Sequence, residues 1–534
     1  MSLLSVRDLT LSINGTSILR DVAFEMREGD VFGLVGESGS GKSMTALSVM
    51  QLLPSGAQVS GHTALAGRDL LALSEADMCE IRGGEIGMIF QEPMTALNPV
   101  QTIGDQVAET LMVHGVADRA EALRVARDRL DRVGLTADRF KLDRYPHELS
   151  GGQRQRVCIA MAVALRPRLL IADEPTTALD VTTQAQILDL LRGLVADEGM
   201  GLLLITHDLA VVSGLADHVA VMKDGAIVEA GRTESLFRTR AHPYTQALFA
   251  ASSHAPVRPP RAAAAAPVLE VRDVVRAYPL SRTGFFQRPP PLRAVDGVNL
   301  IVGEGESVGL VGESGCGKST LTRAILGLES LQGGEIRLGG APVVAGRVPA
   351  ALRRRMQVVF QDPFGSFNPR HRVARLITEP FHLAEGAVPE REEAIDQALL
   401  DVGLNPDDKH KYIHEFSGGQ RQRIAIARAL ILRPDLIVLD EAVSALDVRV
   451  RAQILDLLSD LQERYGLSYL FISHDLSVVR VVTDRVYVMK AGKIVEDGPT
   501  EAVFERPDHP YTRALIAAAP RIPEAWQGDR KFGT

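Results

Sequence analysis

Cysteine is scarce in this sequence, and long apolar runs are missing. Its three cysteines, Cys79, Cys158 and Cys316, lie far apart among 534 residues and form no CxxC pair. This spacing argues against both a disulfide framework and a metal cluster. No apolar stretch approaches the roughly 18 to 20 residues that a membrane-spanning helix needs. The amino terminus, with Arg7 and Asp8 close behind the first residue, lacks the apolar region of a signal peptide. We therefore expect the chain to stay in the cytoplasm.

An excess of positive charge is also missing. The net charge of −8 argues weakly against a protein whose main task is to grip nucleic acid, although a local basic patch is compatible with it. A composition of 46% hydrophobic and 24% charged residues is ordinary for globular protein, and 534 residues suit two or more domains.

Two glycine-rich loops of the GxxxxGK[ST] type are present. The glycines let the backbone bend so that several N–H groups point at one phosphate, and the following helix adds its positive end. The lysine supplies a charge to the terminal phosphates, and the serine after it offers a hydroxyl to Mg²⁺. The predicted nucleotide-binding residues are Gly36, Glu37, Ser38, Gly39, Ser40, Gly41, Lys42 and Ser43 in the first loop, and Gly312, Glu313, Ser314, Gly315, Cys316, Gly317, Lys318, Ser319 and Thr320 in the second.

Polar landmarks follow each loop at the same spacing. From Ser150 to Asp173 is 23 residues, then 34 to His207 and 35 to His242. The second half repeats these distances at an offset of 267, through Ser417, Asp440, His474 and His509. A lone loop motif has a real false-positive rate, but a second copy with matching spacings is hard to obtain by chance. The repeat unit is therefore a whole domain.

The pattern of elements predicts an α/β fold with two tandem P-loop NTPase domains, at 1–250 and 268–534, joined by an Ala/Pro-rich linker at 251–267. Short apolar segments at 31–35, 169–172 and 202–206, and their counterparts at 307–311, 436–439 and 469–473, are typical of parallel strands. An apolar alternation opens each half. We also expect an antiparallel β subdomain in each domain. Helical patterns, such as 117–134, indicate a helical subdomain inserted before Ser150 and again before Ser417. An extra segment at 281–291 is predicted to be a surface loop.

Two adjacent carboxylates follow a hydrophobic strand in each half: Asp173 with Glu174, and Asp440 with Glu441. Because successive residues of a strand point to opposite faces, the two side chains of a pair point in different directions. The aspartate can reach Mg²⁺ while the glutamate can polarise an attacking water, which is the division of labour that phosphoryl transfer needs.

A Ser-Gly-Gly-Gln segment begins a helix in each half. Its bare N–H groups would attract an anion, although a simple glycine-rich loop before a helix explains one copy equally well. Each domain already has a phosphate loop for its own nucleotide. We therefore expect this second helix terminus to bind the nucleotide held by the other domain. These residues are Ser150, Gly151, Gly152 and Gln153, then Ser417, Gly418, Gly419 and Gln420.

With these motifs, the chain resembles the ATP-binding-cassette (ABC) family over essentially its whole length. The resemblance adds Gln91 and Gln361 as further Mg²⁺ ligands beside the serine and aspartate, and His207 and His474 as switch histidines that join the glutamates in catalysis. It also includes Ala-Leu-Asp segments at 178–180 and 445–447. The implied cofactors are ATP and Mg²⁺.

In that family, two cassettes pack head to tail around two ATP molecules. The resemblance implies that Lys42 shares a site with 417–420, and Lys318 with 150–153, so that the cassettes pair within one chain. A short flexible tether raises the effective concentration of one cassette near the other into the mM range. Tyr278 is the expected adenine-stacking aromatic of the second half, where the first half has Ile13. The residue after the acid pair also differs, Pro175 against Ala442, and neither difference removes a catalytic group.

Further strings resemble the peptide and nickel importer branch: 91–99, 361–369, and the His-Pro-Tyr-Thr segments at 242–245 and 509–512. Physically, the last two are helix starts with proline in the first turn. No cysteine follows Cys316, so no iron–sulfur cluster is expected. The resemblance implies two membrane-embedded permease subunits as partners, an extracytoplasmic solute-binding protein that delivers the solute, and a place on the cytoplasmic face of the inner membrane.

Two other classes stay open. A sugar-type tandem importer is disfavoured by the His-Pro-Tyr-Thr segments. A soluble tandem cassette acting on ribosomes or DNA would have a long charged linker or zinc-binding cysteines, and neither occurs here. We therefore expect a peptide-type importer ATPase and no nucleic-acid partner.

Overall fold

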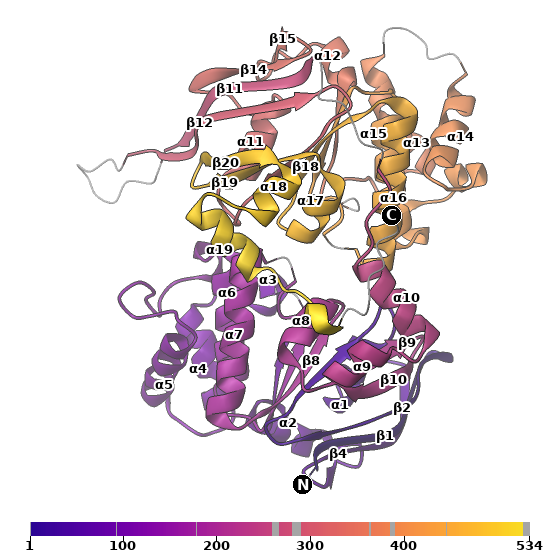
Figure 1. Cartoon of the computed structure of the whole chain (residues 1–534). Helices are drawn as coiled ribbons and strands as arrows, with labels where there is room; N and C mark the ends of the chain where they lie inside the picture. The colour runs from indigo at the N-terminus through magenta and orange to yellow at the C-terminus, as the bar shows by residue number, and fades with distance from the viewer. Residues whose placement is uncertain are drawn as a thin grey trace.

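The computed structural model describes residues 2–91, 93–177, 179–258, 266–279, 290–362, 365–384, 390–444 and 446–526. These residues form two cassettes, the first running from β1 to α10 in the lower half of Figure 1 and the second from β11 to α19 in the upper half. Within these ranges, no helix combines the length and the apolarity needed to cross a bilayer.

Each cassette is built on a six-stranded sheet that is parallel except for one edge strand. The first sheet has the order β10-β9-β3-β8-β7-β6, and the second the order β16-β17-β18-β13-β19-β20. The strands of the first are β3 (Val31–Val35), β6 (Ile86–Ile89), β7 (Leu169–Asp173), β8 (Gly201–Thr206), β9 (His218–Lys223) and β10 (Ala226–Arg232). Those of the second are β13 (Ser307–Val311), β16 (Met356–Val359), β17 (Leu436–Asp440), β18 (Ser468–Ile472), β19 (Arg485–Lys490) and β20 (Lys493–Pro499).

The central strands are buried along all or most of their length, as the continuous apolar runs predict. Every residue of β3 and of β13 is buried, because a parallel sheet is covered on both faces. Parallel pairing of β3 with β8 and of β7 with β8 brings the carboxyl ends of these strands to one edge. The phosphate loop, the acid pair and the switch histidine all follow these ends, so the topology gathers them in one place.

A four-stranded antiparallel sheet lies beside each core sheet. Its strands are β1 (Ser2–Ile13), β2 (Thr16–Arg27), β4 (Ala57–Leu65) and β5 (Arg68–Asp69), and in the second cassette β11 (Pro267–Tyr278), β12 (Leu292–Gly303), β14 (Gly333–Leu338) and β15 (Ala341–Pro342). Asn14 and Gly15 join β1 to β2 as a two-residue hairpin with positive φ at both residues. The corresponding turn of the second cassette contains the extra segment predicted as a surface loop, of which residues 281–289 lie outside the described residues.

Helices fill the stretch before each Ser-Gly-Gly-Gln segment, as predicted. In the first cassette these are α3 (Pro93–Ala96), α4 (Ile103–Val113), α5 (Arg119–Arg132) and η1 (Pro146–Glu148); in the second they are α13 (Val373–Ile377), η2 (Glu379–Leu383), α14 (Arg391–Asp401), η3 (Pro406–His410) and η4 (Ile413–Glu415). The pattern at 117–134 thus forms α5. Both helical groups project to the side of their core sheet (Figure 1).

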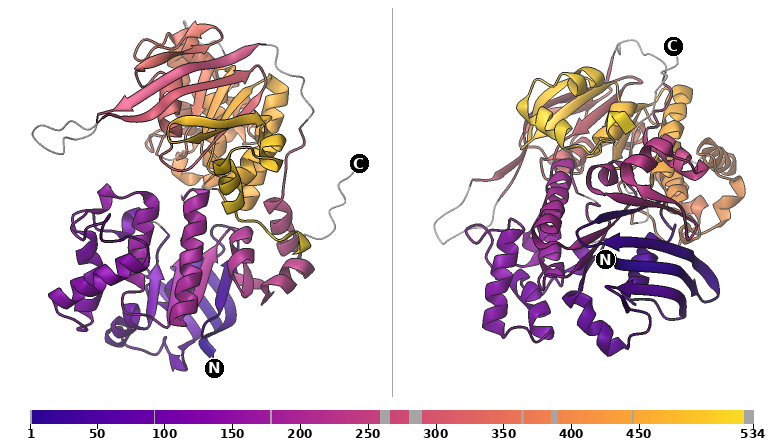
Figure 2. Two further views of the ribbon diagram at one scale, coloured as in Figure 1. Left: turned by 60° about the vertical axis from the view of Figure 1, so that its left-hand side comes forward. Right: turned by 60° about the horizontal axis from the view of Figure 1, so that its bottom comes forward.

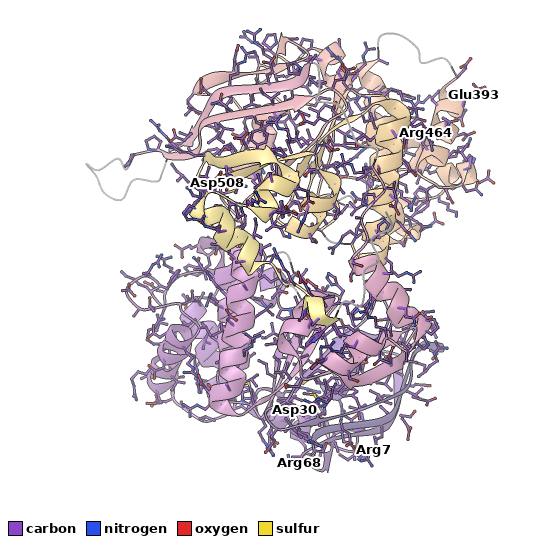
Figure 3. All side chains as sticks on the ribbon, in the orientation of Figure 1. Arg7, Asp30, Arg68, Glu393, Arg464 and Asp508 are labelled. Carbon is purple, nitrogen blue, oxygen red and sulfur yellow. The ribbon has the colours of Figure 1, made fainter. Side chains whose placement is uncertain are left out.

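The other helices cover the core sheets. They are α1 (Lys42–Val49), α2 (Glu75–Gly84), α6 (Gly151–Ala162), α7 (Val181–Glu198), α8 (Leu209–Leu215), α9 (Thr233–Thr239) and α10 (Pro243–Ser252); then α11 (Lys318–Ile325), α12 (Ala350–Arg355), α15 (Gly418–Leu430), α16 (Val448–Tyr465), α17 (Leu476–Val482), α18 (Thr500–Glu505), α19 (Pro510–Ala518) and η5 (Glu524–Trp526). Charged side chains, including Arg7, Arg68, Glu393 and Arg464, spread over the outside of both cassettes (Figure 3).

Each cassette sends a carboxyl-terminal arm onto the other. After α10, His254 approaches Asp456 of α16 at 2.6 Å and Arg258 pairs with Asp484 at 2.8 Å. After α19, Trp526 packs edge-on against Phe237 of α9 with ring centres 5.9 Å apart. Figure 2 shows the second arm crossing to the lower cassette. The predicted linker at 251–267 therefore makes contacts as far as Arg258, and its residues 259–265 lie outside the described residues.

Candidate nucleotide sites

Both phosphate loops connect a buried strand to a helix that begins at the motif lysine. The residue before each lysine, Gly41 or Gly317, has φ of 104° or 115°, a conformation that side-chain-bearing residues rarely adopt. A Cβ on Gly36 would lie 2.2 Å from the carbonyl oxygen of Met222, so that position has no room for a side chain. The loops therefore require their glycines for both conformation and space.

The two lysines are buried beneath their loops, at about one-twentieth exposure. The ammonium of Lys42 donates to the carbonyls of Gly36 at 2.8 Å and Glu37 at 2.7 Å, and Lys318 does the same with Gly312 and Glu313. An ammonium has three donors, so Lys42 keeps one for a phosphate oxygen. In Lys318 the third donor faces the Cys316 sulfur, 3.8 Å from the nitrogen, a weak contact that a phosphate oxygen would replace.

Asp173 ends β7 and is buried at 4% exposure. Its Oδ1 has no hydrogen-bond partner among the described residues. Burial raises the pKa of Asp173 to about 6, although a hydrogen bond from Ser43 opposes the rise. The pKa of Asp440 is also raised by burial. A buried carboxylate oxygen without a partner, beside a serine hydroxyl, is a donor set that fits Mg²⁺.

Glu174 has the left-handed backbone conformation, with φ of 47°. Its carboxylate accepts from Gln91 at 3.2 Å and from Thr177 at 2.9 Å, and His207 Nδ1 lies 3.2 Å away. Burial would raise the pKa of Glu174, but His207 foremost, then the Thr177 hydroxyl and the Lys42 charge, lower it to about 2. The structure therefore brings together Gln91, Glu174 and His207, which lie far apart in the sequence.

Glu441 repeats the backbone conformation, with φ of 51°, and its carboxylate lies 3.2 Å from His474 Nδ1. The serine at the position of Thr177 turns away: Ser444 donates to the Glu441 backbone carbonyl instead of its carboxylate. Gln361 is exposed, and within the described part of the chain no bond from it to Glu441 is found. The second glutamate thus has fewer partners than the first.

The Ser-Gly-Gly-Gln segments form capping boxes. Ser150 accepts from the N–H of Gln153, whose side chain accepts from the N–H of Ser150, and Ser417 with Gln420 repeats the pair. The S-x-x-Q pattern is a known sequence signal for this cap, which sequence reasoning had not used. The cap leaves the first helical N–H groups without an intrahelical acceptor.

The start of each long helix reaches the phosphate loop of the other cassette. Thr182 of α7 donates to the Glu313 carboxylate at 2.9 Å, and Asp180 accepts from the N–H of Ser314 at 3.3 Å. On the opposite side, Arg449 of α16 pairs with Glu37 at 3.0 Å. Arg449 lies 267 residues after Thr182, so the two contacts are related by the internal repeat. Ala178 and Ala445, which begin the predicted Ala-Leu-Asp segments, lie outside the described residues.

Each Ser-Gly-Gly-Gln segment lies against the helix that makes this crossing. A Cβ on Gly419 would lie 2.4 Å from Val450 of α16, the neighbour of Arg449, and one on Gly152 would lie 2.3 Å from Thr183 of α7. The segment of one cassette is therefore carried toward the phosphate loop of the other, which is the head-to-tail order.

Two other residues have contacts of their own. Tyr278, at the end of β11, donates to Glu329 at 2.7 Å, and the Arg276 guanidinium lies 4.6 Å from its ring centre. Adenine stacking on Tyr278 stays a prediction. Burial raises the pKa of Cys316, which favours the protonated thiol and a packing role over the thiolate that a helix start would promote.

Sequence reasoning missed Tyr244 and Tyr511. The His-Pro-Tyr-Thr segments do begin helices, α10 and α19, as predicted. In addition, the Tyr244 hydroxyl accepts from the N–H of Glu37 at 3.3 Å, and Tyr511 accepts from that of Glu313 at 3.0 Å. A tyrosine follows His242 and His509 by the same two positions, and this recurrence was the signal that the sequence offered.

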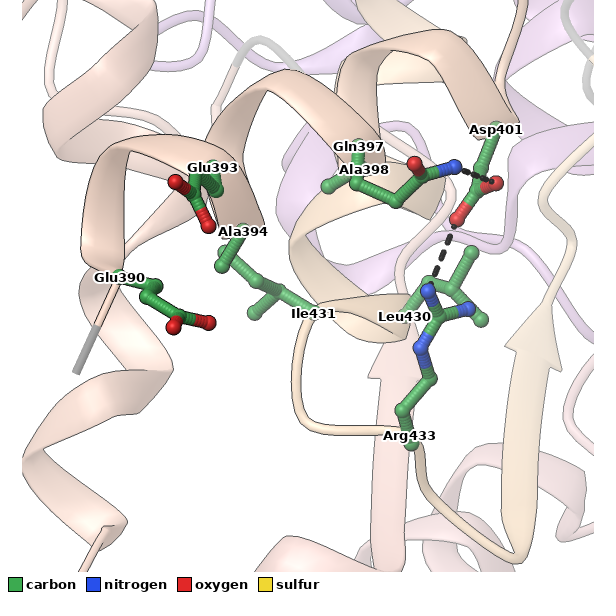
Figure 4. A pocket seen from close by; sticks show the side chains of 9 residues that line it. All are labelled: Glu390, Glu393, Ala394, Gln397, Ala398, Asp401, Leu430, Ile431 and Arg433. Carbon is green, nitrogen blue, oxygen red and sulfur yellow. Dashed lines mark hydrogen bonds and ion pairs between the residues drawn. The ribbon is translucent and has the colours of Figure 1, made fainter. Parts of the chain in front are cut away.

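A cavity of about 320 Å³ lies elsewhere, between α14 and the end of α15 (Figure 4). Its lining includes Glu390, Glu393, Asp401 and Arg433, and Arg433 and Gln397 both contact Asp401. None of its lining residues belongs to a phosphate loop, an acid pair or a Ser-Gly-Gly-Gln segment.

Residues 19–177 and 295–444 match the ABC transporter family, and residues 228–267 and 495–533 match the oligopeptide/dipeptide transporter C-terminal region. The peptidoglycan transport ATP-binding protein YejF of Agrobacterium fabrum is 48% identical over 97% of this chain and 96% of its own length. The glutathione import ATP-binding protein GsiA of Escherichia coli K12 is 47% identical over 94% of this chain and 86% of its own.

The fold and the comparisons define a tandem ABC ATPase: the chain belongs to the ABC transporter family. It is an ATP-binding subunit of the kind that couples ATP hydrolysis to import, and each cassette ends in an oligopeptide/dipeptide transporter C-terminal region. The family and branch predicted from the motifs are confirmed.

Proposed function

We propose that this chain hydrolyses two ATP molecules held between its cassettes and thereby powers a bacterial importer for peptides or related solutes. The observation that carries the proposal is the reciprocal contact of Thr182 with Glu313 and of Arg449 with Glu37. Because each cassette touches the other's phosphate loop, a nucleotide on either loop faces residues of both cassettes.

In the first site, Lys42 and the loop N–H groups bind the phosphates, and Glu174 accepts a proton from the attacking water. His207 holds the Glu174 carboxylate in place, at 3.2 Å. Ser43, Gln91 and Asp173 would hold Mg²⁺, which neutralises charge on the phosphates when bound. In the second site, Lys318 binds the phosphates, Glu441 accepts the proton from the attacking water, and His474 holds the Glu441 carboxylate. The Mg²⁺ ligands there would be Ser319, Gln361 and Asp440.

The opposing Ser-Gly-Gly-Gln segment completes each site. Residues 417–420 would direct the free N–H groups of α15 at the nucleotide on Lys42, and residues 150–153 those of α6 at the nucleotide on Lys318. Closure of the cassettes around ATP would then change the permease conformation, and hydrolysis would release it.

The partners we propose are two membrane-embedded permease subunits, with a solute-binding protein outside the membrane, so that the chain works at the cytoplasmic face. Exposed apolar side chains in the segment around and after Gln91 support a docking surface: Phe90, directly before Gln91, is 45% exposed, and Val100, further along the chain, is 79% exposed. The names of the relatives support a peptide-like solute, since one is a peptidoglycan transport protein and another a glutathione import protein.

Uptake of labelled glutathione and of a labelled tripeptide tests the proposal. A strain lacking the gene should lose uptake of at least one of them, and the wild-type gene should restore it. A gene encoding K42A and K318A together should not, because each lysine is buried against its phosphate loop. Full peptide and glutathione uptake in the deletion strain, with loss of sugar uptake or of translation, would instead favour one of the other two classes.

A further inference from the structure

The His-Pro-Tyr-Thr helix touches both its own phosphate loop and the opposite cassette. The N–H that bonds to Tyr244 belongs to the peptide between Gly36 and Glu37, and the carbonyl of that same peptide accepts from Lys42. One peptide plane is therefore held by the tyrosine at one end and by the lysine at the other. Bonds in such a chain polarise and orient one another.

The second cassette repeats this arrangement. Tyr511 accepts from the N–H of Glu313, and Lys318 donates to the carbonyl of Gly312 at 2.6 Å in the same peptide. The two tyrosines are 267 residues apart, as are the acid pairs. An arrangement that recurs in both halves is a feature of the repeated domain.

The tyrosine rings are fixed from several directions. Both side chains are buried, and burial raises the pKa of each to about 12, so both hydroxyls stay neutral. Lys223 lies 5.2 Å from the Tyr244 ring centre, and Lys490 lies 4.7 Å from that of Tyr511. These cation–π contacts hold the rings against the strand ends.

The turn ahead of each helix is also fixed. The Glu229 carboxylate accepts from the N–H groups of Ala241 and His242, and the His242 ring nitrogen accepts from the N–H of Tyr244 at 3.1 Å. In the second cassette, Glu496 accepts from the N–H groups of Asp508 and His509. Asp508, labelled in Figure 3, lies where the chain enters α19.

The same helices pack across the cassette interface. Val448 of α16 is buried in one cluster with Tyr244 and Leu248, and Val181 of α7 is buried with Tyr511 and Leu515. These valines directly precede Arg449 and Thr182, the residues that contact the opposite loops. When the cassettes dock, α16 therefore packs against α10, which bonds to the first phosphate loop, and α7 packs against α19, which bonds to the second.

We propose that Tyr244 and Tyr511 are positioning residues for ATP hydrolysis, each setting the orientation of the Gly-Glu peptide that holds the phosphate-loop lysine and linking that orientation to cassette packing. This inference rests on the proposed ATP sites and adds a role for the peptide-branch C-terminal region. The tyrosines act through the loop and the lysine, without touching the reacting atoms.

The test uses the full chain with hydrolysis confined to one site. In an E441Q background, turnover comes from the site of Lys42, and in an E174Q background from that of Lys318. Y244F removes only the hydroxyl, so we expect kcat/KM for ATP to fall about 2- to 13-fold in the E441Q background, the range for one lost hydrogen bond. At saturating ATP, kcat in this background should fall more with Y244F than with Y511F, because Tyr511 holds the loop of the substituted site. In the E174Q background, kcat should instead fall more with Y511F than with Y244F.

The matched control is Y487F. Tyr487 is also buried, and its hydroxyl also accepts from a backbone N–H, that of Ile301 in β12 at 3.2 Å, which belongs to neither phosphate loop. The Arg485 guanidinium donates to the same hydroxyl at 2.9 Å. We expect Y487F to leave kcat/KM unchanged in both backgrounds. Equal losses for Y244F in the two backgrounds, a matching loss for Y487F, or unchanged kinetics in all variants would each overturn the inference. Absence of turnover in the unsubstituted chain would instead overturn the proposed function.

Discussion

The Nδ1 atom of His207 lies 3.2 Å from the Oε1 atom of Glu174. Glu174 follows β7 and His207 follows β8, and the parallel pairing of these strands sets the distance. With φ of 47°, Glu174 is also held in a backbone conformation that is costly for a residue with a side chain. A strained, buried carboxylate held by a histidine suits a group that must accept a proton at one position.

Replacing both glutamates by glutamine should separate binding from turnover. E174Q with E441Q keeps the shape of each site but removes the base, so we expect turnover to fall by about 100- to 10,000-fold. Equilibrium binding of a fluorescent ATP analogue should be retained. Undiminished hydrolysis by the double variant would reject the assignment of these residues as bases.

The two histidines should differ in importance. Glu174 keeps contacts to Gln91 and Thr177 when His207 is removed, whereas His474 is the partner found for the Glu441 carboxylate in the described part of the chain. We therefore expect H474A in an E174Q background to lose about tenfold more kcat than H207A in an E441Q background, on the scale of one bond to a charged group. Equal losses would show that the additional partners of Glu174 do not position it.

The head-to-tail packing can be tested by chemical crosslinking. In a chain whose three cysteines are replaced by serine, T182C paired with E313C and R449C paired with E37C should react with a short bifunctional thiol reagent, since both native pairs are in contact. T182C paired with E37C is the control, because Thr182 contacts the second loop. Crosslinking of the control pair at the rate of the native pairs would contradict the packing.

The carboxyl-terminal arm carries the chain's single tryptophan, which makes its docking measurable. Arg238 and Arg240 donate to the carbonyls of Ala525 and Trp526, at 2.7 and 2.6 Å. We expect R238A with R240A to weaken docking of the arm by about 1 to 3 kcal/mol and to shift Trp526 fluorescence to the red. R20A serves as the control, because the Arg20 guanidinium donates to the backbone carbonyl of Asp224 within the first cassette. An unchanged emission spectrum in the double variant would show that these contacts do not hold the arm.

Much of this architecture follows from local sequence. Short local patterns mark the phosphate loops, the buried strands at 31–35 and 307–311 that lead into them, and the acids that end the strands at 169–173 and 436–440. The duplication then places the histidines at matching positions. The helix at 117–134 was likewise marked by its periodicity and appears as α5.

The contacts between distant parts of the chain could not be predicted in this way. Tyr244 and Glu37 are separated by 207 positions, and Arg449 and Glu37 by 412. No local pattern encodes such pairs: Tyr244 meets Glu37 only when the first cassette folds, and Arg449 meets Glu37 only when the two cassettes pack. The capping boxes at Ser150 and Ser417 are a different case, because their S-x-x-Q spacing was visible and was interpreted as an anion site or a glycine-rich loop, not as a cap.

The central claim is that each ATP is enclosed by both cassettes, and site-resolved photolabelling tests it most directly. In the E174Q/E441Q chain, an azido-ATP label should reach peptides of both phosphate loops. Adding S417R should abolish labelling of the loop at 36–43 and spare that at 312–319, while S150R should do the reverse. If S417R instead removed the label from the loop at 312–319, each nucleotide would be held within one cassette and the account would be contradicted.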